Sequence, residues 1–163
     1  MGKSKVPSTP ALRLLKAKGV DYVLHTYAYE ARGGTKVSSR ELGVDEHAVI
    51  KTLIFEDEHR KPVVVLMHGD LEVSGKALAR LLGVKSISPT KPEVAEKHSG
   101  YRVGGTSPFG LKKPLSVYAE ETIFALPKIW INAGQRGLLG ELEPACLDDL
   151  LELTRVRVAQ TVR

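Results

Sequence analysis

The residue with the clearest chemical potential in this chain is Lys51, which lies in the apolar segment V-I-K-T-L-I-F of residues 49–55. A strand period of two places Lys51 on one face with Leu53 and Phe55. An ammonium on an apolar face must reach solvent along its own stem, pair with an anion, or lose its proton. The segment is therefore either an edge strand with its amine in solvent, or a strand that aims a lysine into a pocket to meet a carbonyl or a phosphate.

A glycine-rich stretch over residues 104–110 is the second chemical feature. Gly104 and Gly105 have no side chains, so backbone N–H groups there can approach a ligand closely. Thr106 and Ser107 add two hydroxyl groups. Such a loop suits a ribose, a phosphate or a developing oxyanion. The alternative interpretation is a hairpin turn with a solvated rim.

Basic side chains surround this loop, because residues 97–119 contain Lys97, Arg102, Lys112 and Lys113 and no acid. The whole chain has 24 Lys and Arg against 19 Asp and Glu. Five of those bases lie in residues 1–8 and 155–163, which contain no acid, so the remainder is balanced at 19 against 19. The local cluster, rather than the net charge, therefore predicts contact with nucleic acid, and the tails are at most auxiliary contacts.

Several other classes of site are excluded by spacing. Residues 69–77 resemble a phosphate-binding P-loop, but five residues separate the glycines where four are required, and Ala77 replaces the necessary hydroxyl. The five histidines have no zinc-ligand spacing. Ser107 is not in a G-x-S-x-G elbow. Cys146, the single cysteine, is expected to be a small buried hydrophobe. We expect no metal, no cofactor and no protein nucleophile.

The elements that must position these residues alternate along the chain. A hydrophobic content of 42% and a charged content of 26% are ordinary for a globular protein. No apolar run is long enough to span a bilayer and no signal region precedes the first helix, so we expect a cytoplasmic protein with no membrane contact. Cap and period signals predict helices over residues 10–18, about 37–43, 74–82, 92–100 and 144–153, and strands over 21–29, 49–55, 62–67, 84–87, 115–118, 128–131 and 138–142.

This alternation predicts one α+β domain over residues 1–163, with an ordered core at about 9–159. Many short strands with a few interspersed helices indicate a mixed, barrel-like sheet surrounded by short helices.

Three motifs resemble one family in both sequence and order. They are K-T-L at residues 51–53, G-Y-R-V-G-G-T-S-P-F-G at 100–110 and I-N-A-G-Q-R-G at 131–137. Together they resemble the YbaK family of free-standing aminoacyl-tRNA deacylases, which are related to the editing domain of bacterial prolyl-tRNA synthetase. The second string is long and specific, and the resemblance extends from about Thr9 to the end of the last helix.

The resemblance implies a translation-editing function: hydrolysis of mischarged tRNA, chiefly Cys-tRNA(Pro), without a cofactor. In the family mechanism the thiol of the substrate attacks its own ester carbonyl, the tRNA hydroxyl leaves and a thiolactone is released. The protein then needs only to orient the ester and stabilise charge. The partners implied are the acceptor end of tRNA and, for tRNA selection, prolyl-tRNA synthetase.

The resemblance also implies roles for individual residues. Lys51 matches the essential lysine of the family, Tyr27 matches a pocket tyrosine, and the backbone of Gly104 and Gly105 matches the cradle for the terminal adenosine and the ester. The predicted substrate-binding set is Tyr27, Thr52, Gly104, Gly105, Thr106, Ser107, Gly134 and Arg136, and the predicted tRNA contacts are Arg102, Lys112 and Lys113.

Two departures from the family pattern leave the amino acid open. The loop at residues 30–36, where Cys-specific members place an aromatic side chain, holds Gly33-Gly34, and Tyr29 is the nearest ring. Where such members carry an acid, this chain has Leu138-Leu139. A deacylase for Ala or Ser esters is the close alternative, in which water or a ribose hydroxyl replaces the thiol. A non-catalytic module that binds a tRNA end or a synthetase is the alternative from another class.

Overall fold

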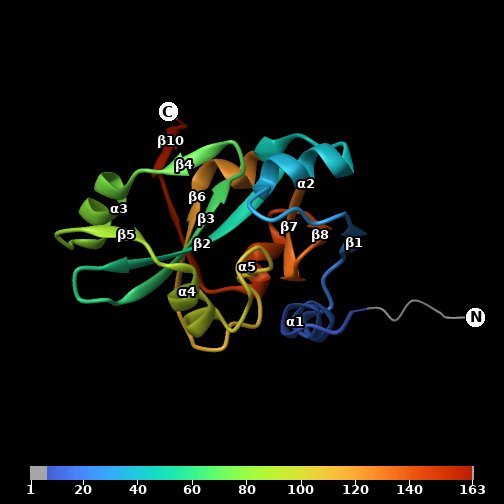
Figure 1. The fold of residues 1–163 in the computed structure, drawn as a ribbon, viewed down its shortest axis with the longest axis horizontal. Coiled ribbons are helices and arrows are strands. Elements are labelled where there is room, and N and C mark those ends of the chain that lie inside the picture. The colour runs from blue at the N-terminus through green and yellow to red at the C-terminus, as the bar shows by residue number, and fades with distance from the viewer. Residues whose placement is uncertain (1–6, 163) are drawn as a thin grey trace, which may run out of the picture.

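A computed structural model describes residues 7–162 (Figure 1). The helical elements are α1 (Pro10–Lys18), α2 (Gly34–Leu42), η1 (Glu46–Ala48), α3 (Gly75–Leu82), α4 (Pro92–Ser99), η2 (Glu121–Ala125) and α5 (Cys146–Leu150). The strands are β1 (Val23–Thr26), β2 (Val49–Asp57), β3 (Pro62–His68), β4 (Leu71–Val73), β5 (Ile87–Pro89), β6 (Ser116–Glu120), β7 (Ile129–Gln135), β8 (Leu138–Leu142), β9 (Leu153–Val156) and β10 (Ala159–Thr161). None of the helices over these residues is long and apolar enough to cross a membrane.

Most strands of the described chain join one mixed sheet in the order β1-β8-β7-β2-β3-β6-β9, with β5 paired to β2, while β10 and β4 form a separate pair. The hairpin of β2 and β3 is antiparallel, whereas β2 pairs with β7, β3 with β6, and β6 with β9 in parallel. Short helices lie around this sheet (Figure 1). The predicted α+β class with a mixed sheet is confirmed.

One edge of β2 is only partly covered, and this gap positions the site. The first edge pairs with β3 from Ile50 to Glu56. The second edge pairs with β7 at Val49 and Ile50, and with β5 from Phe55 to Asp57. Between these two ladders, residues 51–53 have no strand partner on the second edge within the described chain. Their backbone groups on that edge therefore remain available to a ligand.

The sheet separates two apolar clusters, and β2 contributes to both. Ile50 and Ile54 belong to the larger cluster, whereas Phe55 belongs to the second cluster and Leu53 packs against it. This alternation follows from the period of two along a strand. Lys51 therefore shares a face with Leu53 and Phe55, as its spacing predicts.

Local capping chemistry fixes the predicted helices. Thr9 accepts a hydrogen bond from the backbone of Leu12 at the start of α1, and Ser74 accepts one from Ala77 at the start of α3. Both helices end at a glycine in the left-handed region, Gly19 and Gly83. The segment that resembles a P-loop is thus the start of a capped helix.

Several predicted boundaries are wrong. Helix α2 begins at Gly34 instead of about 37, and β7 extends to Gln135 instead of 131. β1 covers only part of residues 21–29, and the strand predicted at 84–87 lies at Ile87–Pro89 because it pairs with the far end of β2. The last helix ends at Leu150 instead of 153, because Leu153 begins a strand that pairs in parallel with β6. The strands β4, β9 and β10 were not predicted, since three or four residues carry too little periodicity.

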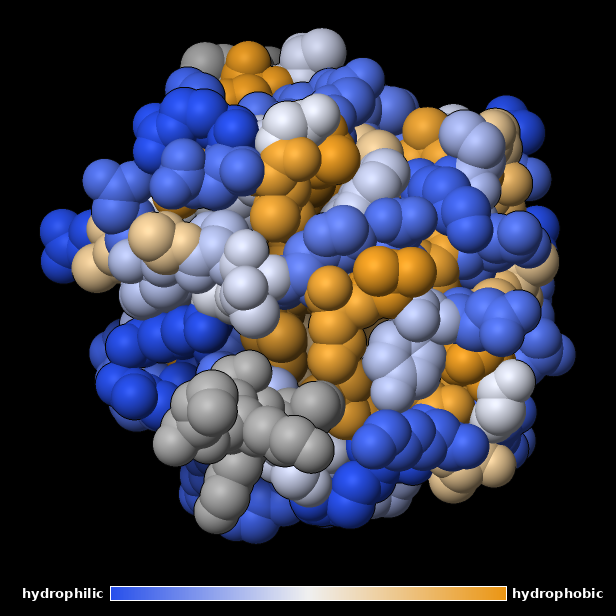
Figure 2. All heavy atoms as spheres, turned by 90° about the vertical axis from the view of Figure 1, so that its right-hand side faces the viewer, coloured by the Kyte–Doolittle hydropathy of each residue, from blue (hydrophilic) through white to orange (hydrophobic). Residues whose placement is uncertain are grey.

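Strand β1 forms one edge of the large sheet. Figure 2 shows the face that lies at the right of Figure 1, where α1, α2 and β1 are found. Apolar surface runs across this face as a band between hydrophilic rims, and Val23 of β1 is 54% exposed. Some apolar side chains of the described residues are therefore exposed on this face.

Candidate functional site

A cavity of about 690 Å³ opens at the gap beside β2. Its walls are formed by β2, the β1–α2 loop with α2, the β5–α4 connection, the glycine-rich loop and the β7–β8 hairpin. These segments are far apart in the sequence. The cavity therefore brings together the three motifs that the sequence analysis singled out.

Lys51 lies in the wall of this cavity and is partly buried. Its Nζ atom donates a hydrogen bond of 2.5 Å to the carbonyl oxygen of Leu71 in β4. Burial lowers the pKa of Lys51, and the nearby carboxylates of Glu72, Glu46 and Asp70 partly oppose that shift. The amine is therefore held against the β4 backbone, and β2 is not an edge strand with its amine simply directed into solvent.

Thr52 also lines the cavity. By the alternation along β2, its side chain lies on the opposite face from that of Lys51. Its hydroxyl oxygen is buried and has no hydrogen-bond partner among the described residues. A buried hydroxyl without a partner costs free energy, so this group is available to bind a polar ligand atom.

Close backbone approach explains the two central glycines of the glycine-rich loop. Gly104 has a φ of +91° and touches the Tyr29 ring so closely that a Cβ atom would overlap the phenolic oxygen. A Cβ atom on Gly105 would lie 2.8 Å from the backbone nitrogen of Arg136. Larger residues therefore do not fit at either position without a shift of the backbone.

Side chains from the β7–β8 hairpin clamp this loop in place. Asn132 donates from Nδ2 to the carbonyl oxygen of Gly104 at 3.2 Å, and its Oδ1 accepts from the backbone of Gly134 at 2.7 Å. Arg136 donates from Nε to the carbonyl oxygen of Val103 at 2.9 Å. The loop and the hairpin therefore form one rigid wall of the cavity.

The tyrosines of the β1–α2 loop contribute a polar and aromatic wall. The Arg136 guanidinium lies 4.9 Å from the centroid of the Tyr29 ring, within cation–π distance. Tyr27 lines the cavity, and burial raises the pKa of its phenol, with Tyr29 adding to the shift. The Tyr27 hydroxyl is therefore protonated at neutral pH and can donate a hydrogen bond.

The predicted catalytic lysine and the predicted substrate-binding residues fall into two groups. The first group lines the cavity and consists of Lys51, Thr52, Tyr27, Gly104, Thr106 and Arg136. Gly105, Ser107 and Gly134 are not among the lining residues. Ser107 is fully buried, and its hydroxyl accepts from the backbone of Phe109 at 3.2 Å, so it stabilises the loop. Gly134 packs against Tyr101 and Thr9.

Asn132 is a lining residue that the sequence analysis did not select. Its signal was an amide side chain two residues before a glycine inside the third motif. That pattern is typical of a side chain that hydrogen-bonds to the backbone two residues ahead, as it does here.

The two departures from the family pattern also lie at this cavity. Gly34 lines it, as does Leu139, whereas Leu138 belongs to the larger apolar cluster and Gly33 packs against Val37. The position where an acid was expected from the family pattern is therefore an apolar part of the wall.

Neither a reactive thiol nor a metal-binding cluster is found among the described residues. Cys146 is partly buried outside the cavity, and burial raises the pKa of its thiol, so the thiol is a poor nucleophile. Within residues 7–162, no cluster of three histidine, cysteine or acidic side chains is arranged to hold a metal ion.

The basic residues divide into exposed and paired ones. Arg102, Lys112 and Lys113 are exposed, and Lys112 packs beside Gly100 at the end of α4. In the C-terminal tail, Arg155 pairs with Asp148 at 2.7 Å, and Arg157 with Glu121 at 2.5 Å. The remaining tail bases, Lys3, Lys5 and Arg163, lie outside the described residues.

The sequence matches the family model for an aminoacyl-tRNA editing domain over residues 33–150. A relative from Enterococcus faecalis, assigned as the Cys-tRNA(Pro)/Cys-tRNA(Cys) deacylase EbsC, is 30% identical over 98% of this chain and 97% of its own. The proline–tRNA ligase of Limosilactobacillus fermentum is 28% identical over 61% of this chain, which corresponds to 18% of that enzyme.

Solved structures show the same fold at low identity. A crystal structure of a hypothetical protein matches 93% of this chain with a TM-score of 0.85 and 21% identity, and covers all of that protein. A crystal structure assigned as a trans-editing enzyme for prolyl tRNA synthetase matches 95% of this chain and 99% of its own, with a TM-score of 0.80 and 22% identity.

Proposed function

The chain belongs to the aminoacyl-tRNA editing domain family, and on this premise we propose that it is a trans-editing deacylase that hydrolyses mischarged tRNA, with Cys-tRNA(Pro) as its leading substrate. One observation carries the proposal. A lysine held at a backbone carbonyl and a rigid glycine-rich loop meet in the same cavity, beside an unpaired stretch of strand edge. This arrangement suits an ester whose carbonyl oxygen gains negative charge during reaction.

We assign the reaction to the substrate thiol. The cysteine sulfur attacks the ester carbonyl carbon, a C–S bond forms, and the C–O bond to the terminal ribose breaks. The thiol proton ends on the ribose hydroxyl, and cysteine thiolactone is released. An attacking group within the substrate already has the proximity that catalysis requires, so the protein contributes orientation and charge stabilisation.

Lys51 is the catalytic residue in this scheme. Its ammonium lies in the cavity wall and stabilises the negative charge that develops on the ester oxygens. Gly104 exposes backbone in the same wall, and Tyr27 and Thr52 supply hydroxyl groups for the ester and the terminal nucleoside. Thr106 and Arg136 complete the polar wall, with Gly105, Ser107 and Gly134 holding it in shape.

The two side chains that the sequence offers as protein nucleophiles, Cys146 and Ser107, do not line the cavity. Cys146 lies outside it, and the hydroxyl of Ser107 is occupied by the backbone of Phe109. This supports a mechanism in which the substrate supplies its own attacking atom.

We place the acceptor end of the tRNA beside the end of α4. Arg102, Lys112 and Lys113 are exposed there, and the acid-free stretch that contains them encloses the glycine-rich loop. Arg155 and Arg157 are already paired with acids, so they contribute less to phosphate binding. A prolyl-tRNA synthetase partner would supply the choice among tRNAs.

The amino-acid pocket is the least family-like part of the site. Leu139 gives an apolar surface where an acid was expected, and the acids that line the cavity, Glu30 and Glu96, are both exposed. An apolar wall also accepts the methyl group of alanine, so alanyl- and seryl-tRNA are the competing substrates.

A panel of purified cysteinyl-, alanyl- and seryl-tRNAs tests the function. We expect the fastest deacylation with Cys-tRNA(Pro) and release of a thiolactone detectable by mass spectrometry. Faster deacylation of alanyl- or seryl-tRNA would move the specificity and exclude the thiol mechanism. Inertness toward all three, with retained tRNA binding, would establish a binding module instead.

A further inference from the structure

The strand β10 lies outside the residues that match the family model, yet it pairs with β4, whose backbone holds Lys51. We propose that Glu120, through β10, is a positioning residue for the Lys51 ammonium. The proposal rests on the proposed function, because it assumes that Lys51 is the catalytic group. It adds a residue that neither the motifs nor the cavity lining contains.

The anchor is a buried carboxylate. Glu120 is only 3% exposed, and its Oε1 accepts hydrogen bonds from the backbone nitrogens of Val158 at 2.8 Å and Ala159 at 2.9 Å. Two N–H donors to one carboxylate oxygen are charge-assisted hydrogen bonds, which are about twice as strong as neutral ones. Glu120 therefore fixes the point where β10 begins.

From that point β10 runs along β4 in antiparallel register, with Thr161 opposite Leu71 and Ala159 opposite Val73. The carbonyl oxygen of Leu71 is the acceptor for the Lys51 Nζ atom. β4 is not part of the large sheet, and its strand partner within the described chain is β10. A three-residue strand is held mainly by such pairing, so release of β10 would loosen the carbonyl that orients the amine.

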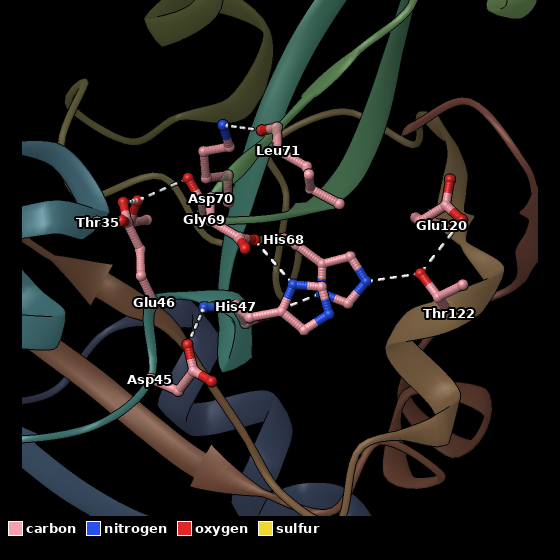
Figure 3. A network of polar contacts seen from close by, with 11 residues as sticks. Thr35, Asp45, Glu46, His47, His68, Gly69, Asp70, Leu71, Glu120 and Thr122 are labelled. Carbon is pink, nitrogen blue, oxygen red and sulfur yellow. Dashed lines mark hydrogen bonds and ion pairs between the residues drawn. The ribbon is translucent and has the colours of Figure 1, made fainter. Parts of the chain in front are cut away.

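A second route runs from the same carboxylate to the residue before Leu71. The hydroxyl of Thr122 lies 3.3 Å from Glu120 Oε2 and 2.7 Å from His68 Nε2. His68 is fully buried, and its other ring nitrogen lies 2.7 Å from the carbonyl oxygen of His47. Figure 3 shows these side chains in one continuous line.

The line ends at Asp70. The rings of His47 and His68 are stacked with centroids 3.8 Å apart, and His47 Nδ1 lies 2.8 Å from the Asp70 carboxylate. The pairing with β10 and this line of side chains thus reach two neighbouring residues, Leu71 and Asp70, and Figure 3 shows the second of the two routes.

The number of hydrogens available to Thr122 and His68 identifies the main hydrogen-bond donors to the Glu120 carboxylate. His68 must use a proton on Nδ1 for the His47 carbonyl, so in the neutral ring Nε2 accepts from the Thr122 hydroxyl. That hydroxyl has one hydrogen, which then cannot also serve Glu120. The two backbone donors at the start of β10 are therefore the main partners of the Glu120 carboxylate.

This assignment predicts different outcomes for two substitutions. Glu120→Gln keeps a side-chain oxygen that can accept from both backbone nitrogens. Glu120→Ala leaves both nitrogens without an acceptor and weakens the anchor at the start of β10, where the Val158 carbonyl still accepts a hydrogen bond from the Ser74 backbone. Glu121→Gln is the matched control, because Glu121 is the next residue along, carries the same charge, and pairs with the exposed Arg157 instead.

The first measurement follows deacylation of Cys-tRNA(Pro) by the full chain. We expect Glu120→Ala to lower kcat by about 10- to 100-fold, the scale of a misplaced catalytic group, with KM changed by less than about twofold. Glu120→Gln and Glu121→Gln should both stay within about twofold of the unsubstituted chain. Circular dichroism at the assay temperature establishes that each variant is folded, and Glu120→Asp, one methylene shorter, replaces the alanine variant if that one does not fold.

The second measurement needs no substrate. In Glu120→Ala we expect faster amide hydrogen exchange in residues 71–73 and, by NMR of Lys51 labelled at Cε, a pKa that moves upward because the amine gains solvent. If the unsubstituted chain deacylates none of the three aminoacyl-tRNAs, the proposed function fails, while this measurement still tests the positioning. Unchanged exchange and an unchanged Lys51 titration in folded Glu120→Ala would overturn the proposal, as would a loss of activity of equal size in Glu121→Gln.

Discussion

Replacing Lys51 by methionine separates the chemistry of this site from its packing. The substitution keeps an unbranched apolar stem on the face shared with Leu53 and Phe55 and removes only the ammonium. If that ammonium stabilises the charge that develops on the ester, kcat should fall by about 10²- to 10³-fold, the usual loss for one such group. This corresponds to roughly 3–4 kcal/mol of transition-state stabilisation.

The same substitution should have a small effect on stability, because its two contributions oppose one another. The Leu71 carbonyl loses its 2.5 Å donor, which costs about 1–3 kcal/mol if the oxygen stays dry. The chain also no longer carries an ammonium whose charged form burial disfavours. We expect a net change of at most about 2 kcal/mol, or roughly 4–8 °C in Tm.

The pH dependence gives a second test of the same residue. Burial lowers the pKa of Lys51 below 10.5, so activity that requires the ammonium should decline as the pH rises through that lowered value. In that window the unfolded chain binds more protons than the folded one, so the Lys51 contribution to the free energy of unfolding rises with pH. Lys51→Met should remove this contribution.

Single-turnover deacylation of Cys-tRNA(Pro), corrected for spontaneous ester hydrolysis, provides the assay, and thermal unfolding provides the stability. Lys128→Met is the matched control, because Lys128 is an exposed lysine outside the cavity. A folded Lys51→Met variant that keeps activity within about threefold of the control would refute the catalytic assignment.

Three further predictions test the wall, the buried network and the nucleic-acid surface. Gly105→Ala should destabilise the fold by about 1–3 kcal/mol in urea unfolding, because its Cβ atom would lie 2.8 Å from a backbone atom. Gly140→Ala is the control and should be close to neutral, because its Cβ atom would have its nearest neighbour at 3.8 Å. Equal effects of the two substitutions would contradict the clamped loop. Burial lowers the pKa of His68, so its contribution to the free energy of unfolding should be complete above the ordinary pKa of 6.5 and decline as the pH falls below that value. A His68→Gln variant whose free energy of unfolding falls just as steeply with acid would contradict this origin. Removing both Lys112 and Lys113 should lower the slope of log Kd for tRNA against log salt by roughly 1 to 2, and an unchanged slope would place the acceptor stem elsewhere.

Local signals were sufficient for much of the framework. Cap signals predict the helices over residues 10–18 and 74–82, and Thr9 and Ser74 cap them because capping depends only on residues within one turn. The strands predicted over residues 49–55 and 62–67 form the antiparallel pair β2 and β3, because residues close in sequence pair readily. The boundary at Leu153 was wrong because a parallel strand pairing with β6 overrides the helical pattern of the sequence.

The candidate site was only partly predictable. The sequence motifs predict Lys51 and Gly104 as site residues, and both line the cavity. Ser107 was selected for its hydroxyl, but nothing in the sequence reveals that this hydroxyl is buried against the backbone of Phe109. The role of Asn132 is not predictable from the sequence, because an amide at a strand bulge acquires that role only when the glycine-rich loop packs beside it.

The sequence by itself determined the periods, the caps and the motifs, and with them the α+β class and the face on which Lys51 lies. These are properties of residues that are near one another along the chain. The tertiary structure alone decided that β7 and β5 leave a gap beside β2, and that the Lys51 ammonium meets the carbonyl of Leu71, a residue of β4 paired with the C-terminal strand. Those features depend on pairings between segments distant in sequence, whose formation is governed by the packing of the whole sheet and not by any local pattern.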